Sequence, residues 1–426
     1  MRTGSIMLLA LCLLSAAKAQ DELGPPTDSS AQLDSAEEMM RDDLVRLRDV
    51  FVDIGDYNGA LGPAQQVVEQ TSEEVGDMDP RLAPDLTALA EIQRQIGEYA
   101  LAEETYLRVI GILESQSNKF APELIAPYHG LGKTFLATAN YSAAMTVLDQ
   151  ARHVSRRNLG LFNIDQIAII DDQTTALLGL RDVPAASELQ RDRLDLAIKT
   201  FGENSPEVVP YHYYLADYYA SSRLKNRAHD EYQRAVEVLS ATSGEYSADL
   251  LPPLMAIMAL NRGDRDTGVE AVHVRAILDN SEDLDPALRA AALASLGDWH
   301  LVRLDNTEDA FSYYRAAYAT AAKEQRDRLF GVPKLLDFVA PMNKISPRKA
   351  IGLRSGIGTI RLQFTVEADG TTSGAEVLEV SPPDSVEEDY LSRLSAARFR
   401  PRFIDGEPVA TAQTRMNHHF WYFAKN

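Results

Sequence analysis

The sequence predicts a mostly α-helical protein, in which an α-solenoid of about seven helix pairs is followed by a small α+β domain. Three observations lead to this fold class. Small residues recur about every 42 residues through the middle of the chain, the last eighty or so residues alternate apolar and polar side chains, and 426 residues are too many for one core of typical size. A folded, soluble protein is expected, because 45% of the residues are apolar and 25% are charged.

The N-terminus has the pattern of a secretory signal peptide over 1–19, followed by a polar, disordered leader over 20–34. Arg2 precedes an apolar run of about twelve residues, whereas a membrane-spanning helix needs about 20. Cleavage is expected before Gln20. Cys12, the single cysteine, lies inside this segment, so the mature chain would have no thiol for a disulfide, a nucleophile or a metal site.

Charge is spread unevenly along the chain. The net charge is −21, and loss of Arg2 and Lys18 with the signal segment makes it −23. The ten basic and ten acidic residues of 345–426 cancel, so the region 20–344 carries the whole negative charge. Such an acidic body argues against nucleic acid or anionic lipid as the main partner.

A repeat with a period of about 42 residues fills the region 35–325. Its most regular position holds a small residue: Ala60, Ala102, Ala144, Ala186, Ala228, Gly268 and Ala310. A second position lies five residues earlier: Gly55, Gly97, Ala139, Arg181, Arg223, Gly263 and Asp305. A third position lies four residues after the first: Ala64, Tyr106, Leu148, Gln190, Tyr232, Val272 and Tyr314. We expect two helices in each repeat, because small residues let paired helices approach and large residues fill the holes beside them.

This pattern resembles the tetratricopeptide repeat (TPR), with helices lengthened beyond the usual period of about 34 residues. The third unit matches best, with YHGLGKTF at 128–135 followed by Ala144 and Leu148. The resemblance implies seven helix pairs stacked into a right-handed superhelix with a concave face. The fourth unit is degenerate and the sixth is shortened. Prolines are expected at or before the start of the first helix of several units: Pro80, Pro122, Pro206, Pro252 and Pro286.

One expected helix carries five tyrosines between 211 and 219. Tyr211, Tyr214 and Tyr218 form a stripe at helical spacing that would line the concave face and stack on a bound peptide. The alternative is packing of these rings against neighbouring helices, which is the commoner role of aromatic residues at such spacing.

Residues 326–347 are predicted to be a linker between the repeats and the C-terminal domain. Gly331, Pro333 and Pro341 interrupt regular structure there, and one short helix is expected over 334–338.

The region 348–426 is expected to fold in the order strand, strand, helix, strand. In 358–366 the apolar residues Ile360, Leu362 and Phe364 alternate with polar ones, and Asp369 with Gly370 supplies a tight turn. A second alternating run covers 375–380, and apolar residues at helical spacing predict a helix over 386–398. A last strand is expected over 411–423.

The motifs GTIRLQFTV (358–366), RFRP (398–401) and DGEP (405–408) resemble the C-terminal domain of the TonB family, periplasmic proteins that pass energy to outer-membrane transporters. The resemblance covers about 352–423. It implies that the last strand binds an extended segment of a transporter at an open sheet edge, unless the repeats or a second copy cover that edge. The residues expected to bind this partner are Thr411, Gln413, Arg415, Asn417 and His419.

No set of residues with catalytic, cofactor-binding or metal-binding spacing is recognised. His418 and His419 are neighbours in the expected strand and point to opposite faces, so we expect one half-buried and one solvated imidazole rather than a metal site. Ser346 and Lys349 match the Ser-x-x-Lys spacing of penicillin-binding enzymes, but the companion motifs are missing. We therefore expect no enzymatic activity and no cofactor.

Taken together, these patterns favour a non-enzymatic periplasmic adaptor that uses the repeats and the C-terminal sheet to bind proteins, in TonB-dependent transport across the outer membrane or in envelope assembly. The alternative is a membrane-anchored energy transducer of the TonB type, with an uncleaved N-terminal helix that contacts inner-membrane motor proteins. The resemblance implies an intramembrane histidine for that role, and 1–19 contains no histidine. An enzyme with a site in the repeat groove is a third hypothesis.

Overall fold

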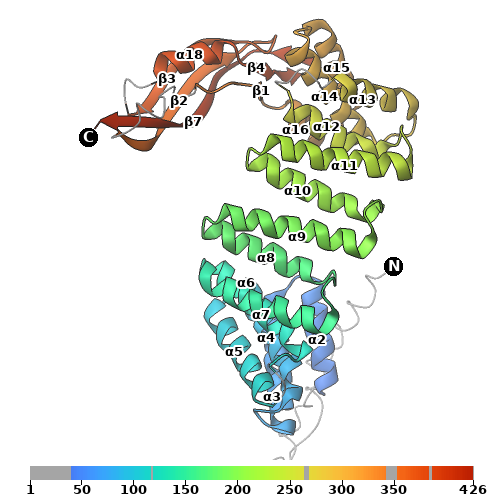
Figure 1. Cartoon of the computed structure of the whole chain (residues 1–426), viewed down its shortest axis with the longest axis vertical. Coiled ribbons are helices and arrows are strands. Elements are labelled where there is room, and N and C mark those ends of the chain that lie inside the picture. Colours follow the sequence, from blue (N-terminus) through green and yellow to red (C-terminus); the bar gives the residue numbers. More distant parts are fainter. Residues whose placement is uncertain (1–39, 117–118, 263–267, 342–352, 383–385, 426) are drawn as a thin grey trace, which may run out of the picture. The chain divides into compact units, whose positions relative to one another are not determined.

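The computed structural model describes residues 40–116, 119–262, 268–341, 353–382 and 386–425 (Figure 1). The predicted signal peptide at 1–19 and leader at 20–34 lie outside these residues. The chain divides into two compact units, Met1–Asn158 and Leu159–Asn426, so the division falls inside the repeat region. None of the helices in the described ranges is both long enough and apolar enough to cross a membrane.

The first unit consists of helices joined by short turns. They are α2 (Arg41–Asp53), α3 (Tyr57–Val75), α4 (Ala83–Gln95), α5 (Tyr99–Gln116), α6 (Ile125–Ala137) and α7 (Tyr141–Leu159). Short 3-10 turns at Pro80–Leu82 and Pro122–Leu124 lead into α4 and α6, at positions where proline is tolerated because its missing N–H has no helical partner.

The second unit continues the helix pairs and ends in strands. Its helices are α8 (Gln166–Gly179), α9 (Val183–Phe201), α10 (Val209–Ser221), α11 (Lys225–Ser243), α12 (Leu251–Leu260), α13 (Gly268–Asn280), α14 (Pro286–Arg303), α15 (Thr307–Thr320) and α16 (Lys323–Phe330). Turns at Pro206–Val208 and Ala248–Leu250 precede α10 and α12.

The small-residue position of the repeat is buried, as predicted. Six of the seven expected residues are 0% exposed: Ala60, Ala102, Ala144, Ala186, Ala228 and Ala310. Five residues earlier the chain turns between the two helices of a pair, with a positive φ between 49° and 86° at Gly55, Gly97, Ala139, Arg181, Arg223 and Asp305. A residue in this left-handed conformation commonly ends a helix. The helix pairs therefore form a TPR-like repeat array.

The prediction for the sixth unit is wrong by two residues. Val272 was expected in the core but is 69% exposed, whereas Val274 is 0% exposed. The interval of 42 residues after Ala228 in fact leads to Glu270, and the short interval of 40 follows it. Gly268 is small, like the residues at this position in the other units, but the buried face of α13 is the one that carries Val274.

Buried tyrosines join the two helices of several pairs. Tyr106 donates a hydrogen bond to Glu91 at 3.0 Å, Tyr314 donates one to Asp298 at 2.9 Å, and Tyr232 bonds Asp217 in the same manner. The ring of Tyr106 occupies the space that a Cβ on Gly130 would need, because the two would lie 2.3 Å apart. Glycine at that position is thus required by close packing.

The C-terminal part of the chain forms three small sheets and one helix. The elements are β1 (Lys334–Asp337), β2 (Leu353–Val366), β3 (Thr372–Ser381), α18 (Glu387–Ser395), β4 (Arg398–Arg400), β5 (Arg402–Ile404), β6 (Glu407–Val409) and β7 (Thr411–Lys425). All pairs are antiparallel: β1 with β4, β5 with β6, and a three-stranded sheet in the order β3-β2-β7. The predicted order strand, strand, helix, strand corresponds to β2, β3, α18 and β7.

The predicted helix at 334–338 is instead strand β1, paired through Lys334 with Arg400 and through Leu335 with Phe399. Pro333 favours this outcome, since proline disfavours a helical residue before it and begins an extended segment. The predicted linker at 326–347 is also more ordered than expected in its described part, because Phe330 and Leu336 are buried with Phe403 in one core.

Candidate protein-binding edge

Strand β7 forms one edge of the three-stranded sheet. Its inner side pairs with β2, and no other strand of the described residues pairs with its outer side. Helix α18 covers one face of this sheet (Figure 1), and its Tyr390 and Leu394 share a core with Ile360, Leu362 and Phe364 of β2. Within the ranges that the structure describes, the outer side of β7 therefore has no strand partner, which is the condition that strand addition requires.

The two edges of the sheet differ in regularity. The pairing of β7 with β2 runs without interruption from Leu353 opposite Lys425 to Phe364 opposite Thr414. In contrast, β3 shifts register against β2 twice within its ten residues. Bulges distort an edge and discourage further pairing, so β7 offers the better template for an extended segment.

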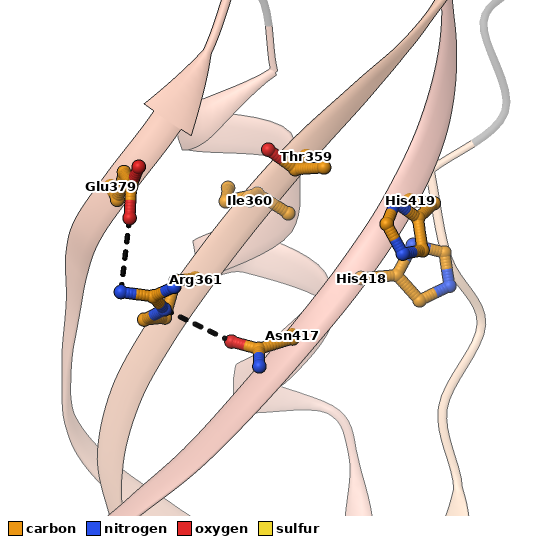
Figure 2. Close-up of a pocket in the computed structure, with 7 residues that line it drawn as sticks. All are labelled: Thr359, Ile360, Arg361, Glu379, Asn417, His418 and His419. Atoms are coloured by element: carbon orange, nitrogen blue, oxygen red, sulfur yellow. Dashed lines mark hydrogen bonds and ion pairs between the residues drawn. The ribbon is translucent and has the colours of Figure 1, made fainter.

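The polar face of the sheet, which α18 does not cover and which is called the outer face below, carries three of the predicted partner-binding residues of β7. Arg415, Asn417 and His419 are exposed, and they alternate with half-buried residues. In Figure 2, Arg361 of β2 lies between Asn417 of β7 and Glu379 of β3. Arg361 Nε donates to Asn417 Oδ1 at 3.2 Å, and its guanidinium pairs with Glu379 at 3.0 Å. These three side chains line a pocket of about 200 Å³ on the surface of the sheet.

Two of the predicted residues lie differently. Gln413 has a φ of 54° and sits in a bulge, because Thr411 and Thr414 oppose Val366 and Phe364. The extra residue reverses the alternation, so Thr411 lies opposite buried Val366 and belongs to the inner face rather than the outer one. Of the residues predicted to bind the partner, Thr411 thus lies on a different face of the sheet from Arg415, Asn417 and His419.

The inner face of β7 is fastened to α18. The Tyr390 hydroxyl hydrogen-bonds His418 Nδ1 at 2.7 Å, and Phe420 is 6% exposed beside the same tyrosine. His418 is half-buried and His419 is exposed, as expected for neighbours in a strand. Burial lowers the pKa of the His418 imidazole, because the charged ring loses solvation.

The His418 imidazole should therefore titrate below 6.5, and neutral His418 should stabilise the sheet above that pH. This stability is lost as the pH falls through the lowered pKa, because the imidazole binds a proton more tightly in the unfolded chain than in the folded one. The titration can be followed by NMR of the ring Cε1–H, with His418→Gln to assign the signal. A midpoint at or above 6.5 would show that the inner face is solvated.

The predicted tyrosine stripe packs mainly on the preceding helix. Tyr211 stacks on Phe201 of α9 with centroids 6.3 Å apart, and the Tyr218 hydroxyl lies 3.2 Å from Ser187 Oγ. Tyr214 is 44% exposed, with the guanidinium of Arg193 4.0 Å from its ring centroid. The structure thus gives Tyr211 and Tyr218 packing contacts, and only Tyr214 presents much of its ring.

A buried ion pair that no sequence pattern predicted ties the strands to the repeats. Arg400 of β4 donates from Nε and Nη2 to the Asp298 carboxylate of α14 at 2.8 and 2.7 Å, and both side chains are 3% exposed. Arg262 approaches the same carboxylate at 3.1 Å. Burial works to raise the pKa of Asp298, but Arg400 and then Arg262 outweigh it and hold that pKa below its ordinary value.

Aromatic packing and surface ion pairs reinforce this attachment. Phe403 of β5 lies among Phe311, Tyr314 and Phe330, with its centroid 4.9 Å from that of Phe330. Arg315 of α15 bonds Glu407 of β6 at 2.8 Å. The RFRP motif therefore spans two cores: Phe399 lies with the three-stranded sheet and Arg400 reaches into the last helix pairs.

Chemistry-bearing clusters are sparse in the residues that the structure describes. No group of three or more His, Cys, Asp or Glu residues there is arranged to hold a metal ion. Ser346 and Lys349, which match an enzyme spacing, lie outside the described ranges. The surface of β7 thus remains the candidate with the clearest means of binding another molecule.

No protein-family model matches the chain, and none of the curated proteins matches it. Several solved helical-repeat structures are similar to parts of it. The TPR-like repeats of a Podosopora anserina protein of the kinesin light chain type are 18% identical, cover 47% of this chain and 95% of their own, and have a TM-score of 0.42. A TPR repeat-containing protein of Cytophaga hutchinsonii is 13% identical over 62% of this chain and 91% of its own (TM-score 0.42).

A third structure, of pilF from Pseudomonas aeruginosa, is 19% identical over 57% of this chain and 93% of its own, with a TM-score of 0.35. At these identities and scores the likenesses carry no argument about function. The TPR-like description rests on the helix pairs and their buried alanines.

Proposed function

We propose that this protein is a non-enzymatic periplasmic adaptor whose β7 edge captures an extended segment of an envelope protein, such as an outer-membrane transporter, while the TPR-like repeats hold a second protein. The observation that supports this most directly is the uninterrupted run of β7 from Thr414 to Lys425, paired on one side only in the described residues. The run contains no proline, so every residue can supply both backbone groups.

Strand addition suits such an edge. A segment of about five or six residues would form a similar number of backbone hydrogen bonds, each contributing roughly 0.5–1.5 kcal/mol. Side chains on the outer face would lie beside Arg415, Asn417 and His419, and those on the inner face beside Thr414 and Met416. The partner would thereby be read by backbone pairing first and by alternate side chains second.

Two proline variants test the edge. Successive N–H groups of a strand point to opposite sides, so of Met416 and Asn417 one donates toward β2 and the other toward the open edge. Proline at the residue whose N–H points to β2 should lower the melting temperature strongly. Proline at the residue whose N–H points to the open edge should leave the sheet folded but reduce partner capture by about tenfold or more, because a donor is lost and the ring obstructs pairing.

Capture can be measured by photocrosslinking from position 415 in envelope preparations, with mass spectrometry to identify the crosslinked peptide. The matched control places the crosslinker at Ser373 on the opposite edge strand β3. An adduct with an extended segment of a transporter or another envelope protein supports the proposal. Undiminished adducts with the edge-facing proline variant, shown to be folded, would rule out strand addition at β7.

The proposed compartment needs a separate measurement. A mature chain that starts at Gln20 by mass spectrometry would support secretion of an adaptor, consistent with the signal-like pattern of 1–19. A chain that keeps this segment in the inner membrane would instead favour the anchored transducer.

A further inference from the structure

One corner of the first unit gathers positive charge in an otherwise acidic protein. Lys119, His153, Arg156 and Arg157 are all exposed there. They surround Phe120, whose ring centroid lies 4.3 Å from the Arg157 guanidinium and 5.2 Å from Lys119 Nζ. The His153 ring lies 5.4 Å from the same centroid.

The cations of this corner differ from the others of the unit in their partners. Arg41, Arg81 and Arg108 each pair with an aspartate at 2.7–3.0 Å. Within the described residues, Lys119, Arg156 and Arg157 have no carboxylate within 4 Å. Two arginines at the end of α7 are favourable by themselves, since cations stabilise a helix C-terminus. That effect does not account for Lys119, which comes from the turn before α6.

The chain itself contains a segment of complementary charge. Residues 20–39 carry six acidic residues and no lysine or arginine: Asp21, Glu22, Asp28, Asp34, Glu37 and Glu38. This segment is followed directly by Met40, the N-cap residue of α2. In a stack of antiparallel helices, α2 begins at the same edge at which α7 ends, so the segment leaves the stack on the edge that carries the basic corner.

The reach is sufficient. The corner lies five helices beyond α2, which is at most about 50 Å when neighbouring helices are roughly 8–10 Å apart. Twenty extended residues span about 65 Å. We propose that the acidic segment 20–39 docks on the corner formed by Lys119, Phe120, His153, Arg156 and Arg157.

Pulsed electron paramagnetic resonance on the full chain tests this docking. Nitroxide labels are placed at Ser29→Cys in the acidic segment and at Gln150→Cys on α7, about 10 Å from Arg157 along the helix, with Cys12→Ser to remove the native thiol. A short-distance population is expected in low salt. It should shrink in 1 M salt, where charges are screened beyond about 3 Å.

Charge reversal separates docking from chance proximity. The triple variant Lys119→Glu, Arg156→Glu, Arg157→Glu should abolish the short distances, and lysine at Asp28, Asp34, Glu37 and Glu38 in the same chain should restore them. The control Arg181→Glu, Lys225→Glu, Arg227→Glu changes three cations of the other unit and should have no effect. An unchanged distribution after reversal, or no restoration in the swapped chain with both variants folded, would overturn the proposal. Short distances only between differently labelled molecules would assign the corner to a second copy and also overturn it.

Discussion

Replacing Arg400 with alanine is expected to lower the free energy of unfolding by about 3–5 kcal/mol. The substitution leaves the buried Asp298 carboxylate with Arg262 as its remaining close cation, and it removes the hydrogen bond from Arg400 to the Leu329 carbonyl. Hydrogen exchange measured by mass spectrometry should accelerate in α14, β1 and β4, while the first unit stays protected. The measurement belongs at neutral pH, because stability from the lowered pKa of Asp298 is present above about pH 4 and is lost as the pH falls through that lowered pKa.

The control for this variant is an exposed ion pair of the same chemistry. Arg361 and Glu379 are 51% and 61% exposed, so Arg361→Ala should change the free energy of unfolding by only about 0–1 kcal/mol. The double variant Arg400→Met, Asp298→Leu should recover part of the loss, because it removes the buried carboxylate that Arg400→Ala leaves behind. Recovery should be incomplete, because Arg262 and the Tyr314 hydroxyl also lose their partner. Equal effects of Arg400→Ala and Arg361→Ala would contradict the structural account of the buried pair.

The second large effect is expected at Tyr106, where alanine should cost about 3–5 kcal/mol. The side chain is 1% exposed, its hydroxyl bonds Glu91, and its ring fills the space beside Gly130. Alanine would leave a cavity at the junction of α4, α5 and α6. Urea denaturation, with hydrogen exchange to locate the loosened helices, measures the effect.

Two further variants sharpen the test of Tyr106. Tyr106→Leu should cost less than alanine, because Leu148 occupies the equivalent position of the next repeat and packs beside Gly132. Tyr246→Ala removes a ring that is 54% exposed and should stay within about 0.5 kcal/mol of the unchanged protein. A cost for Tyr106→Ala no larger than that of Tyr246→Ala would refute the packing argument.

The repeats were predictable because their signal is local and recurs. A buried alanine such as Ala144 needs only a small side chain at one spacing, and six of the seven units repeat the requirement. The prediction was wrong at Gly268 because small size alone does not define the position, which belongs to the face of α13 that carries Val274. One irregular interval was enough to shift the assignment.

The attachment of the strands to the helices was not predictable in the same manner. Asp298 and Arg400 are 102 residues apart, and neither has a neighbour in sequence that marks it as buried. Strand β1 has four residues and depends on β4 for its pairing, so its local sequence was compatible with a short helix. Such features depend on tertiary contacts that alternation and spacing do not contain.

For the candidate edge, the sequence located the strand but not its irregularity. Alternation correctly separated exposed Arg415, Asn417 and His419 from the inner face. The bulge at Gln413 has a positive φ without the glycine that would have indicated it in the sequence, and it places Thr411 on the other face. Residue types alone could not show that β7 pairs regularly from Thr414 onward while β3 is bulged, because both runs alternate well.

The RFRP motif contributes to two cores, and this affects which fragments of the protein can fold. A fragment excised at residue 348 would lack β1, the partner of β4, and would expose Phe403 without the rings of Tyr314 and Phe330. Its exposed aromatic surface should promote aggregation, even though the β3-β2-β7 sheet has its own core. A fragment that begins at Pro286, where α14 starts, would keep those rings together and is the shorter piece worth purifying.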